Sequence, residues 1–126
     1  MTFPIYCYKD ENETIPFKEW SESLEVIQRS KLNAKLDALN LNGESLRPQV
    51  LTDTDKPGIY KIRVKGNVQL RPLLCRTPDN SGYVFLIGAK EVQWVLKPKD
   101  VLETAVKYKE KLYADFETRS VKHERY

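Results

Sequence analysis

Residues 59–65 constrain the fold of this chain more than any other segment, because apolar and cationic side chains alternate strictly along them. In a β-strand, successive side chains point to opposite faces of the sheet, so Lys61, Arg63 and Lys65 would share one face. The tyrosine, isoleucine and valine that alternate with them would share the other. Gly66, which an asparagine follows, is typical of a hairpin turn. We therefore expect a β-ribbon with one cationic and one apolar face.

The register of the returning strand decides which side chains meet on the cationic face. With a two-residue loop, Lys65 would lie opposite Val68, and a charge would stand beside a core residue. A three-residue loop, or a bulge at the glycine, would instead pair Arg63 with Arg71 and leave the opposite face uniformly apolar. We expect this second register.

The pairing of Arg63 with Arg71 has two interpretations. Like charges opposite each other destabilise a sheet, and a protein keeps such a pair more readily when an anion lies between them. Equally, each arginine can extend into solvent or meet a glutamate, since basic strand faces are often merely solvated. Both interpretations stay open on the sequence alone.

The rest of the pattern predicts one α+β domain over residues 1–126, in the order β, α, α, β, β, β, α. Two apolar stripes at helical spacing, closed by Gly43, indicate a helical hairpin. Residues 83–89 are apolar on both faces, as in a central strand, and Pro98 favours the start of a final helix. We expect the hairpin and the C-terminal helix to pack on a mainly antiparallel sheet, with the tail, 118–126, free to be flexible.

Charge is distributed unevenly along the 126 residues. Residues 1–58 hold seven Lys/Arg and ten Asp/Glu, a net charge of −3, whereas residues 59–126 hold fourteen and eight, a net charge of +6. The positive half indicates an anionic partner. No apolar run reaches membrane-spanning length and no secretory signal is visible, so we expect a cytoplasmic location and no membrane partner.

Cysteine and histidine content argues against metal chemistry. The two cysteines, Cys7 and Cys75, fall in predicted strands, where reduced core thiols are the more common outcome in an intracellular protein. With one histidine besides, the chain offers too few ligands for a structural zinc site. We expect no metal and no cofactor.

Five motifs follow one another along most of the chain. They are a helical hairpin with a tryptophan and a terminal glycine (17–43), an apolar–aromatic–x–apolar–Arg strand (58–63), a strand with an arginine (70–73), an apolar strand that runs into a glycine and a lysine (85–90), and a helix with a small residue at position 105 (98–107). In this order they resemble the RelE/HigB superfamily of toxin–antitoxin toxins, especially its phage-derived HigB-like branch. The chain departs from that branch at Ala89, where an aromatic residue is usual, at Glu91, where a second lysine is usual, and over residues 92–96, where the usual link is rich in threonine and lysine.

The resemblance implies a RelE-like small domain that serves as the toxin of a type II toxin–antitoxin system. Such a toxin is a ribosome-associated mRNA endoribonuclease, or mRNA interferase, that inhibits translation. Its partners would be a cognate antitoxin protein, mRNA and the ribosome. The implied hydrolase chemistry is attack of a ribose 2′-hydroxyl on the adjacent phosphate without a metal, which needs a base, cations and an acid. Whether this chain is an active enzyme stays open.

Candidate phosphate-binding residues follow from the resemblance and the cationic pattern together. Arg63 and Arg71 would stabilise the phosphate, because guanidinium groups make bidentate phosphate contacts. The resemblance also implies RNA contacts by basic and aromatic residues of the later strands and the tail. These candidate RNA-binding residues are Lys61, Lys65, Lys90, Lys97, Arg119, Arg125 and Tyr126.

Acid–base and stacking roles have candidates with common alternatives. His123 is the third candidate catalytic residue, because its side chain titrates near neutrality, and Tyr126 could take the same role. A histidine in a tail is, however, more often solvated. Trp94 and Tyr83 could stack on unpaired bases, although core packing is the commoner role for each.

Two other functions compete with the ribonuclease. One is a non-enzymatic inhibitor of DNA gyrase, as in the ParE branch of the same fold. The other is an inactive phage-derived remnant of the fold. The cationic face favours the ribonuclease, because a gyrase inhibitor needs no pair of phosphate-clamping arginines, whereas Glu91 in place of a lysine favours the remnant.

Overall fold

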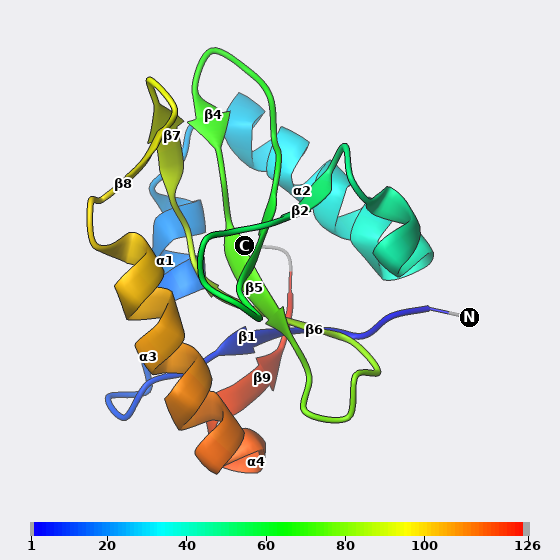
Figure 1. Cartoon of the computed structure of the whole chain (residues 1–126), viewed down its shortest axis with the longest axis vertical. Helices are drawn as coiled ribbons and strands as arrows, with labels where there is room; N and C mark the ends of the chain where they lie inside the picture. Colours follow the sequence, from blue (N-terminus) through cyan, green and yellow to red (C-terminus); the bar gives the residue numbers. More distant parts are fainter. Residues whose placement is uncertain (1, 125–126) are drawn as a thin grey trace.

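The computed structural model describes residues 2–124, which fold around a six-stranded sheet. In spatial order the strands are β2 (Leu51–Asp53), β3 (Tyr60–Ile62), β5 (Leu73–Arg76), β6 (Tyr83–Ile87), β1 (Ile5–Tyr8) and β9 (Ser120–Lys122) (Figure 1). β1 pairs in parallel with β6, and the other neighbouring strands of this sheet are antiparallel. The expected α+β class with a mainly antiparallel sheet is therefore confirmed.

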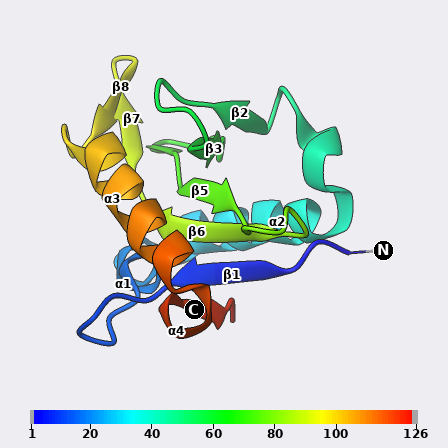
Figure 2. The ribbon, with the colours of Figure 1, turned by 60° about the horizontal axis from the view of Figure 1, so that its bottom comes forward.

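Helices cover both faces of this sheet, with α2 and α3 on opposite sides (Figure 2). The elements are α1 (Pro16–Glu22), α2 (Val26–Asn42), the 3₁₀ helix η1 (Gly43–Leu46), α3 (Val101–Ala114) and α4 (Phe116–Arg119). α2 buries Leu32, Leu36 and Leu39, which recur at helical spacing, in the cluster on one face. Residues 101, 105 and 112 of α3 do the same on the other face. Two successive helices before the sheet's later strands, and a C-terminal helix after them, are present as predicted.

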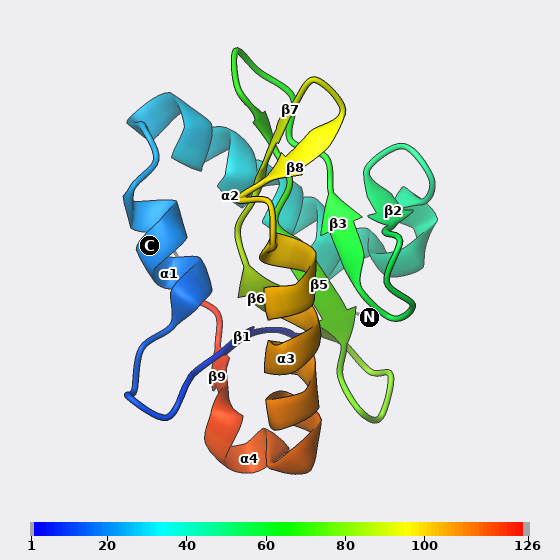
Figure 3. The same cartoon turned by 60° about the vertical axis from the view of Figure 1, so that its left-hand side comes forward.

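A second, three-stranded sheet in the described chain consists of β4 (Gln69–Leu70), β7 (Lys90–Val92) and β8 (Val95–Lys97). β7 and β8 form a hairpin that projects near the start of α3 (Figure 3). β4 pairs with β7, so this hairpin is tied to the segment that returns from β3. The sequence pattern did not predict the hairpin, because its two strands are short and lie mostly in solvent.

The C-terminal segment also differs from expectation. Residues 116–122 form α4 and β9, whereas a flexible tail from residue 118 was expected. β9 pairs antiparallel with β1, matching Cys7 with Val121 and Tyr6 with Lys122. Val121 packs against the same core cluster as α2. Backbone hydrogen bonds to a free strand edge, together with this apolar contact, fix the segment in place.

The two cysteines do not form a disulfide, as expected. Cys7 lies in the core cluster on the α2 face, and Cys75 lies in the cluster on the α3 face. Burial raises the pKa of the Cys75 thiol to about 12. Among the helices of residues 2–124, none is long and apolar enough to cross a membrane.

Candidate phosphate-binding site

The pairing of β3 with β5 sets Arg63 opposite Arg71. β3 and β5 are antiparallel, and the same register continues through a bridge between Val64 and Leu70. The backbone N–H of each bridge residue donates to the carbonyl of the other, at 3.1 and 3.0 Å. This register leaves an odd number of residues, 65–69, between the two bridge residues and sets Arg63 opposite Arg71, so the expected register is confirmed. Both side chains lie on the α3 side of the sheet, because Val64 and Leu70 face α2.

Arg71 is a buried cation whose charge is only partly compensated. The residue is 6% exposed, and its Nη1 donates to the carbonyl of Leu70 at 2.9 Å. Its Nη2 lies 3.4 Å from the Gln69 side-chain oxygen. Its Nε lies 3.4 Å from Glu91 Oε1 and makes no hydrogen bond. Burial lowers the pKa of Arg71, Glu91 raises it and Arg63 lowers it, with a net decrease. A second anion at this position would stabilise the charged guanidinium.

Glu91 lies between two of the cations. Its Oε1 atom is 3.9 Å from the Lys61 Nζ atom and 3.4 Å from Arg71 Nε. The carboxylate reaches this place because β7 pairs with β4 and sets Glu91 opposite Gln69. We call Lys61, Arg63, Arg71 and Glu91 the cationic cluster. Among the contacts described, Lys61 and Arg71 share this carboxylate and Arg63 has none, so the cluster carries excess positive charge.

A separate basic groove lies beside α2. It has a volume of about 320 Å³ and is lined by Lys31 and Lys35 of α2 together with Arg63 and Lys65. No carboxylate lines this groove, and none of these four side chains has an ion pair within residues 2–124. The groove is therefore a second basic region at which a phosphate backbone could bind.

His123 lies on the other side of the sheet from the cationic cluster. Its backbone N–H donates to the carbonyl of Ile5 at 3.0 Å, which extends the β9–β1 pairing. Its ring Nδ1 is 3.6 Å from Cys7 Sγ, and the ring meets Phe17 edge-on at 6.0 Å. Cys7 and Phe17 belong to the core cluster under α2. The structure therefore does not bring His123 together with Arg63 and Arg71.

Lys90, Lys97 and Arg119 make no described side-chain contact with the cationic cluster. Lys90 and Lys97 pair across the hairpin and line a hollow of about 760 Å³ that also contains Trp20. They point away from Glu91, since adjacent strand residues alternate. Arg119 donates from Nη1 to the carbonyl of Lys9 at 3.4 Å, a contact within the fold. Arg125 and Tyr126 lie outside the described residues.

The two candidate stacking residues have opposite environments. Tyr83 is fully buried, and its hydroxyl donates to the Glu44 carboxylate, so it is a core residue as expected. Trp94 is 93% exposed at the tip of the β7–β8 hairpin, so core packing was the wrong prediction for it. The exposure of Trp94 and the position of Glu91 both result from the β7–β8 hairpin, which the sequence pattern did not predict.

Comparison of the chain with protein-family models, curated proteins and solved structures gives no match. Within residues 2–124 there is no group of three or more His, Cys, Asp or Glu side chains that could hold a metal ion.

Proposed function

We propose that this chain is a RelE/HigB-like toxin that binds RNA at the cationic cluster and cleaves it. The observation that carries the proposal is the buried, incompletely neutralised Arg71 paired across the strands with Arg63. The motifs that resemble the superfamily contribute these two arginines. The parallel β1–β6 pair between the helical hairpin and α3 supports a RelE-like arrangement of the domain. The proposal includes a cytoplasmic toxin with mRNA, the ribosome and an antitoxin as partners.

The proposed reaction uses the cationic cluster alone. Arg71 and Arg63 hold the non-bridging oxygens of one phosphodiester and stabilise the charge of the phosphorane. Glu91 accepts the proton of the ribose 2′-hydroxyl as the 2′-oxygen forms its bond to phosphorus. The bond from phosphorus to the 5′-oxygen breaks, and Lys61 donates a proton to that oxygen. The products are a 2′,3′-cyclic phosphate and a 5′-hydroxyl.

The same contacts also return the cluster to its starting state. The proton on Glu91 passes to Lys61, whose Nζ atom lies 3.9 Å from the carboxylate. His123 takes no part, since it lies on the α2 side of the sheet. The acid that the resemblance assigns to the tail is thus supplied by a lysine of β3 in this proposal.

A second candidate function is RNA binding without cleavage, as in an inactive remnant of the fold. The ion pairs of Glu91 with Lys61 and Arg71 favour it, because the carboxylate stands where a substrate phosphate would bind. In that case Glu91 competes with RNA and does no chemistry. No feature of the described residues favours gyrase inhibition over either candidate.

Replacement of Glu91 by glutamine separates the two candidates, since it removes the charge and keeps the size. The purified variants would be incubated with labelled single-stranded RNA, with and without ribosomes. Under the first candidate, E91Q binds RNA at least as tightly as the wild type, but its cleavage rate is lower by a factor of at least about 100. Under the second, the wild type shows no cleavage and E91Q binds RNA severalfold more tightly.

The matched control is Glu22→Gln, because Glu22 is exposed on α1 and takes part in no described ion pair. E22Q should bind and cleave like the wild type. Ribosome profiling after tightly controlled expression gives the cellular test, in which cleavage at fixed codon positions supports the toxin. A wild-type chain that neither binds nor cleaves RNA, or that causes supercoiling defects instead, would overturn the proposal.

A further inference from the structure

The tip of the β7–β8 hairpin displays apolar side chains to solvent. Trp94 is 93% exposed, and Val92 and Val95, which pair across the hairpin beside it, are 50% and 49% exposed. Single exposed apolar residues are common, but a fully exposed tryptophan flanked by two exposed valines is a patch. No aromatic partner of Trp94 occurs in residues 2–124. The hairpin therefore presents Trp94 to a ligand or partner.

The backbone of the tip is strained in a way that favours function over stability. Gln93 and Trp94 both have positive φ, 50° and 69°, in the two-residue turn between β7 and β8. Such turns favour Asn-Gly, because residues with a Cβ atom are disfavoured at positive φ. Observed strain of this kind concentrates at binding and catalytic sites. The turn thus holds Trp94, which is almost fully exposed, at a positive φ that is unfavourable for tryptophan.

A hollow connects Trp94 with the cationic cluster. Its volume is about 440 Å³, within the size range of small-ligand sites. Trp94, Val95 and Leu96 line it from the hairpin, and Val101 and Leu102 line it from α3. The residues that line its polar side are Lys61, Glu91, Lys99, Asp53, Thr54 and Asp55. A ligand that contacts Trp94 can therefore reach Lys61 and Glu91 from the same hollow.

The chemistry of this lining matches an unpaired nucleobase with its phosphate. An aromatic face takes the flat base by stacking. Asp55 is exposed, has no described ion pair and can accept a hydrogen bond from an exocyclic amino group. Lys61 and Lys99 can hold the adjoining phosphate. The mixed polarity of the hollow disfavours the apolar face of a partner helix.

We propose that Trp94 stacks on an unpaired RNA base and that Asp55 selects bases with an amino group, next to the phosphate held by the cationic cluster. This inference rests on the proposed function and specifies its substrate as single-stranded RNA. The base that occupies the hollow is adenine, cytosine or guanine in preference to uracil, because uracil has no amino group.

The test compares Trp94→Ala and Trp94→Phe in binding to a fluorescent single-stranded RNA hexamer and to the same hexamer with one abasic position. W94A should weaken binding to the intact hexamer about 5- to 150-fold, and W94F should retain most of the affinity. W94A should have little effect on the abasic RNA. Asp55→Ala, which removes the acceptor oxygens, should reduce the preference for oligo(A) or oligo(C) over oligo(U).

The double variant Gln93→Asn/Trp94→Gly controls for folding. It restores the preferred turn residues, so it should melt at or above the wild-type temperature and bind RNA as weakly as W94A. Unchanged binding by W94A, while an Arg71 variant abolishes binding, would overturn the stacking inference and leave the proposed function intact. An equal loss on intact and abasic RNA would overturn stacking in favour of a backbone or protein contact. A wild-type chain with no RNA affinity would overturn both proposals.

Discussion

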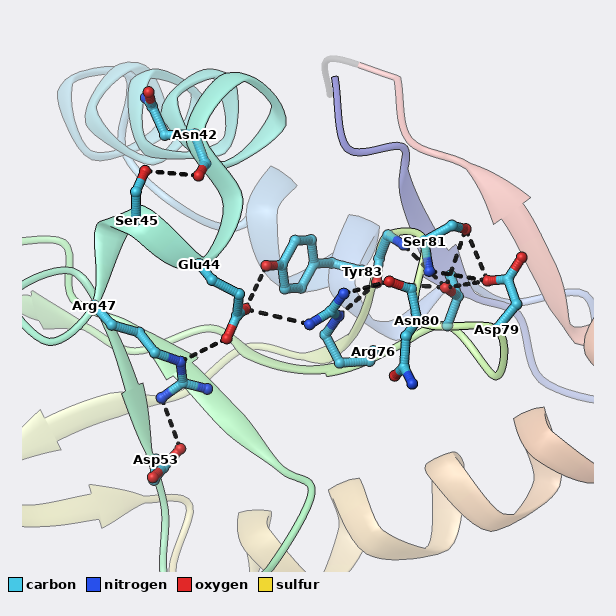
Figure 4. Close-up of polar contacts among 12 residues, drawn as sticks. Asn42, Glu44, Ser45, Arg47, Asp53, Arg76, Asp79, Asn80, Ser81 and Tyr83 are labelled. Atoms are coloured by element: carbon cyan, nitrogen blue, oxygen red, sulfur yellow. Dashed lines mark hydrogen bonds and ion pairs between the residues drawn. The ribbon is translucent and has the colours of Figure 1, made fainter. Parts of the chain in front are cut away.

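Two groups of charged residues in this molecule, each containing two arginines, differ in their charge balance. In the first, shown in Figure 4, Arg47 lies 2.8 Å from Glu44 Oε1 and 2.8 Å from Asp53 Oδ1. Arg76 Nη1 lies 3.5 Å from the other oxygen of Glu44. We call these four residues, with Tyr83, the balanced network. Its two guanidinium groups meet two carboxylates, whereas in the cationic cluster Lys61 and Arg71 share one carboxylate and Arg63 meets none.

The pKa values of the arginines reflect this difference. Burial lowers the pKa of Arg47, but Glu44 and Asp53 outweigh it, so the pKa is raised. Burial lowers the pKa of Arg71, and Glu91 does not outweigh it while Arg63 adds to the decrease. A raised pKa means that the fold already stabilises the charged form. A lowered pKa means that the charged form lacks compensation, which a bound phosphate would supply.

The balanced network has a structural role that its geometry makes clear. Its guanidinium groups also lie over aromatic rings, Arg47 over Tyr60 at 4.8 Å and Arg76 over Tyr83 at 4.9 Å. Glu44 comes from η1, Arg76 from β5 and Tyr83 from β6, so the network fastens η1 to the sheet. Arginine content alone therefore does not distinguish the balanced network from the proposed phosphate-binding site, whereas the ratio of cations to carboxylates differs between them.

The largest expected effect concerns Arg71, which precedes β5, in comparison with Arg76, which ends it. Arg71→Lys keeps the charge but loses the fork of nitrogens, so cleavage should fall about 100- to 1000-fold. Arg76→Lys is the matched control and should cleave at nearly the wild-type rate. Single-turnover rates on one RNA would measure both. Similar losses in the two variants would show that the comparison between the groups does not hold.

The next effect concerns stability. Glu44→Ala removes the acceptor of the buried Tyr83 hydroxyl and a partner of both arginines in the balanced network. Loss of a buried hydrogen-bond partner costs about 1–3 kcal/mol, which should lower the melting temperature by several degrees. RNA binding at 25 °C should be unchanged. Calorimetry measures the melting temperature, with Glu22→Ala as the control. A loss of RNA affinity without a loss of stability in Glu44→Ala would contradict the structural role.

Acid should weaken the fold through the same region. Burial raises the pKa of Glu44, but hydrogen bonds from Tyr83 and Arg47 outweigh it and the pKa is lowered from 4.5. Hydrogen bonds from Ser81 and Thr77 lower the pKa of Asp79 from 3.8 to about 2. Because folding lowers both values, their stabilisation is complete above about pH 4.5 and is lost as the pH falls toward 2.

Urea midpoints measured from pH 7 to pH 2.5 would test this expectation. The wild type should lose stability below about pH 4.5, and the double variant Glu44→Gln/Asp79→Asn should show a flatter profile over that range. The double variant should also be less stable than the wild type at pH 7. Parallel profiles for the two proteins would remove these carboxyl groups as the source of the acid effect.

The sequence predicted those parts of the fold and site that depend on local alternation. The Arg63–Arg71 register follows from side chains within one hairpin, and the structure has it. Glu91 and His123 could not be placed, because each depends on pairing between distant segments, β4 with β7 and β1 with β9. The prediction that Trp94 is buried was wrong for a related reason. An apolar side chain is expected in the core unless the hairpin that exposes it is known.

The smallest expected effect concerns Arg63, which is exposed and has no ion pair in the described chain. If it contacts one phosphate of a single strand, Arg63→Ala should lower the magnitude of the salt slope of RNA binding by about 0.7. Its melting temperature should stay at the wild-type value, in contrast to Glu44→Ala. Lys107→Ala, an exposed cation of α3 away from the cationic cluster, should leave the slope unchanged. Equal slopes for the wild type and R63A would confine the phosphate contacts to Lys61 and Arg71.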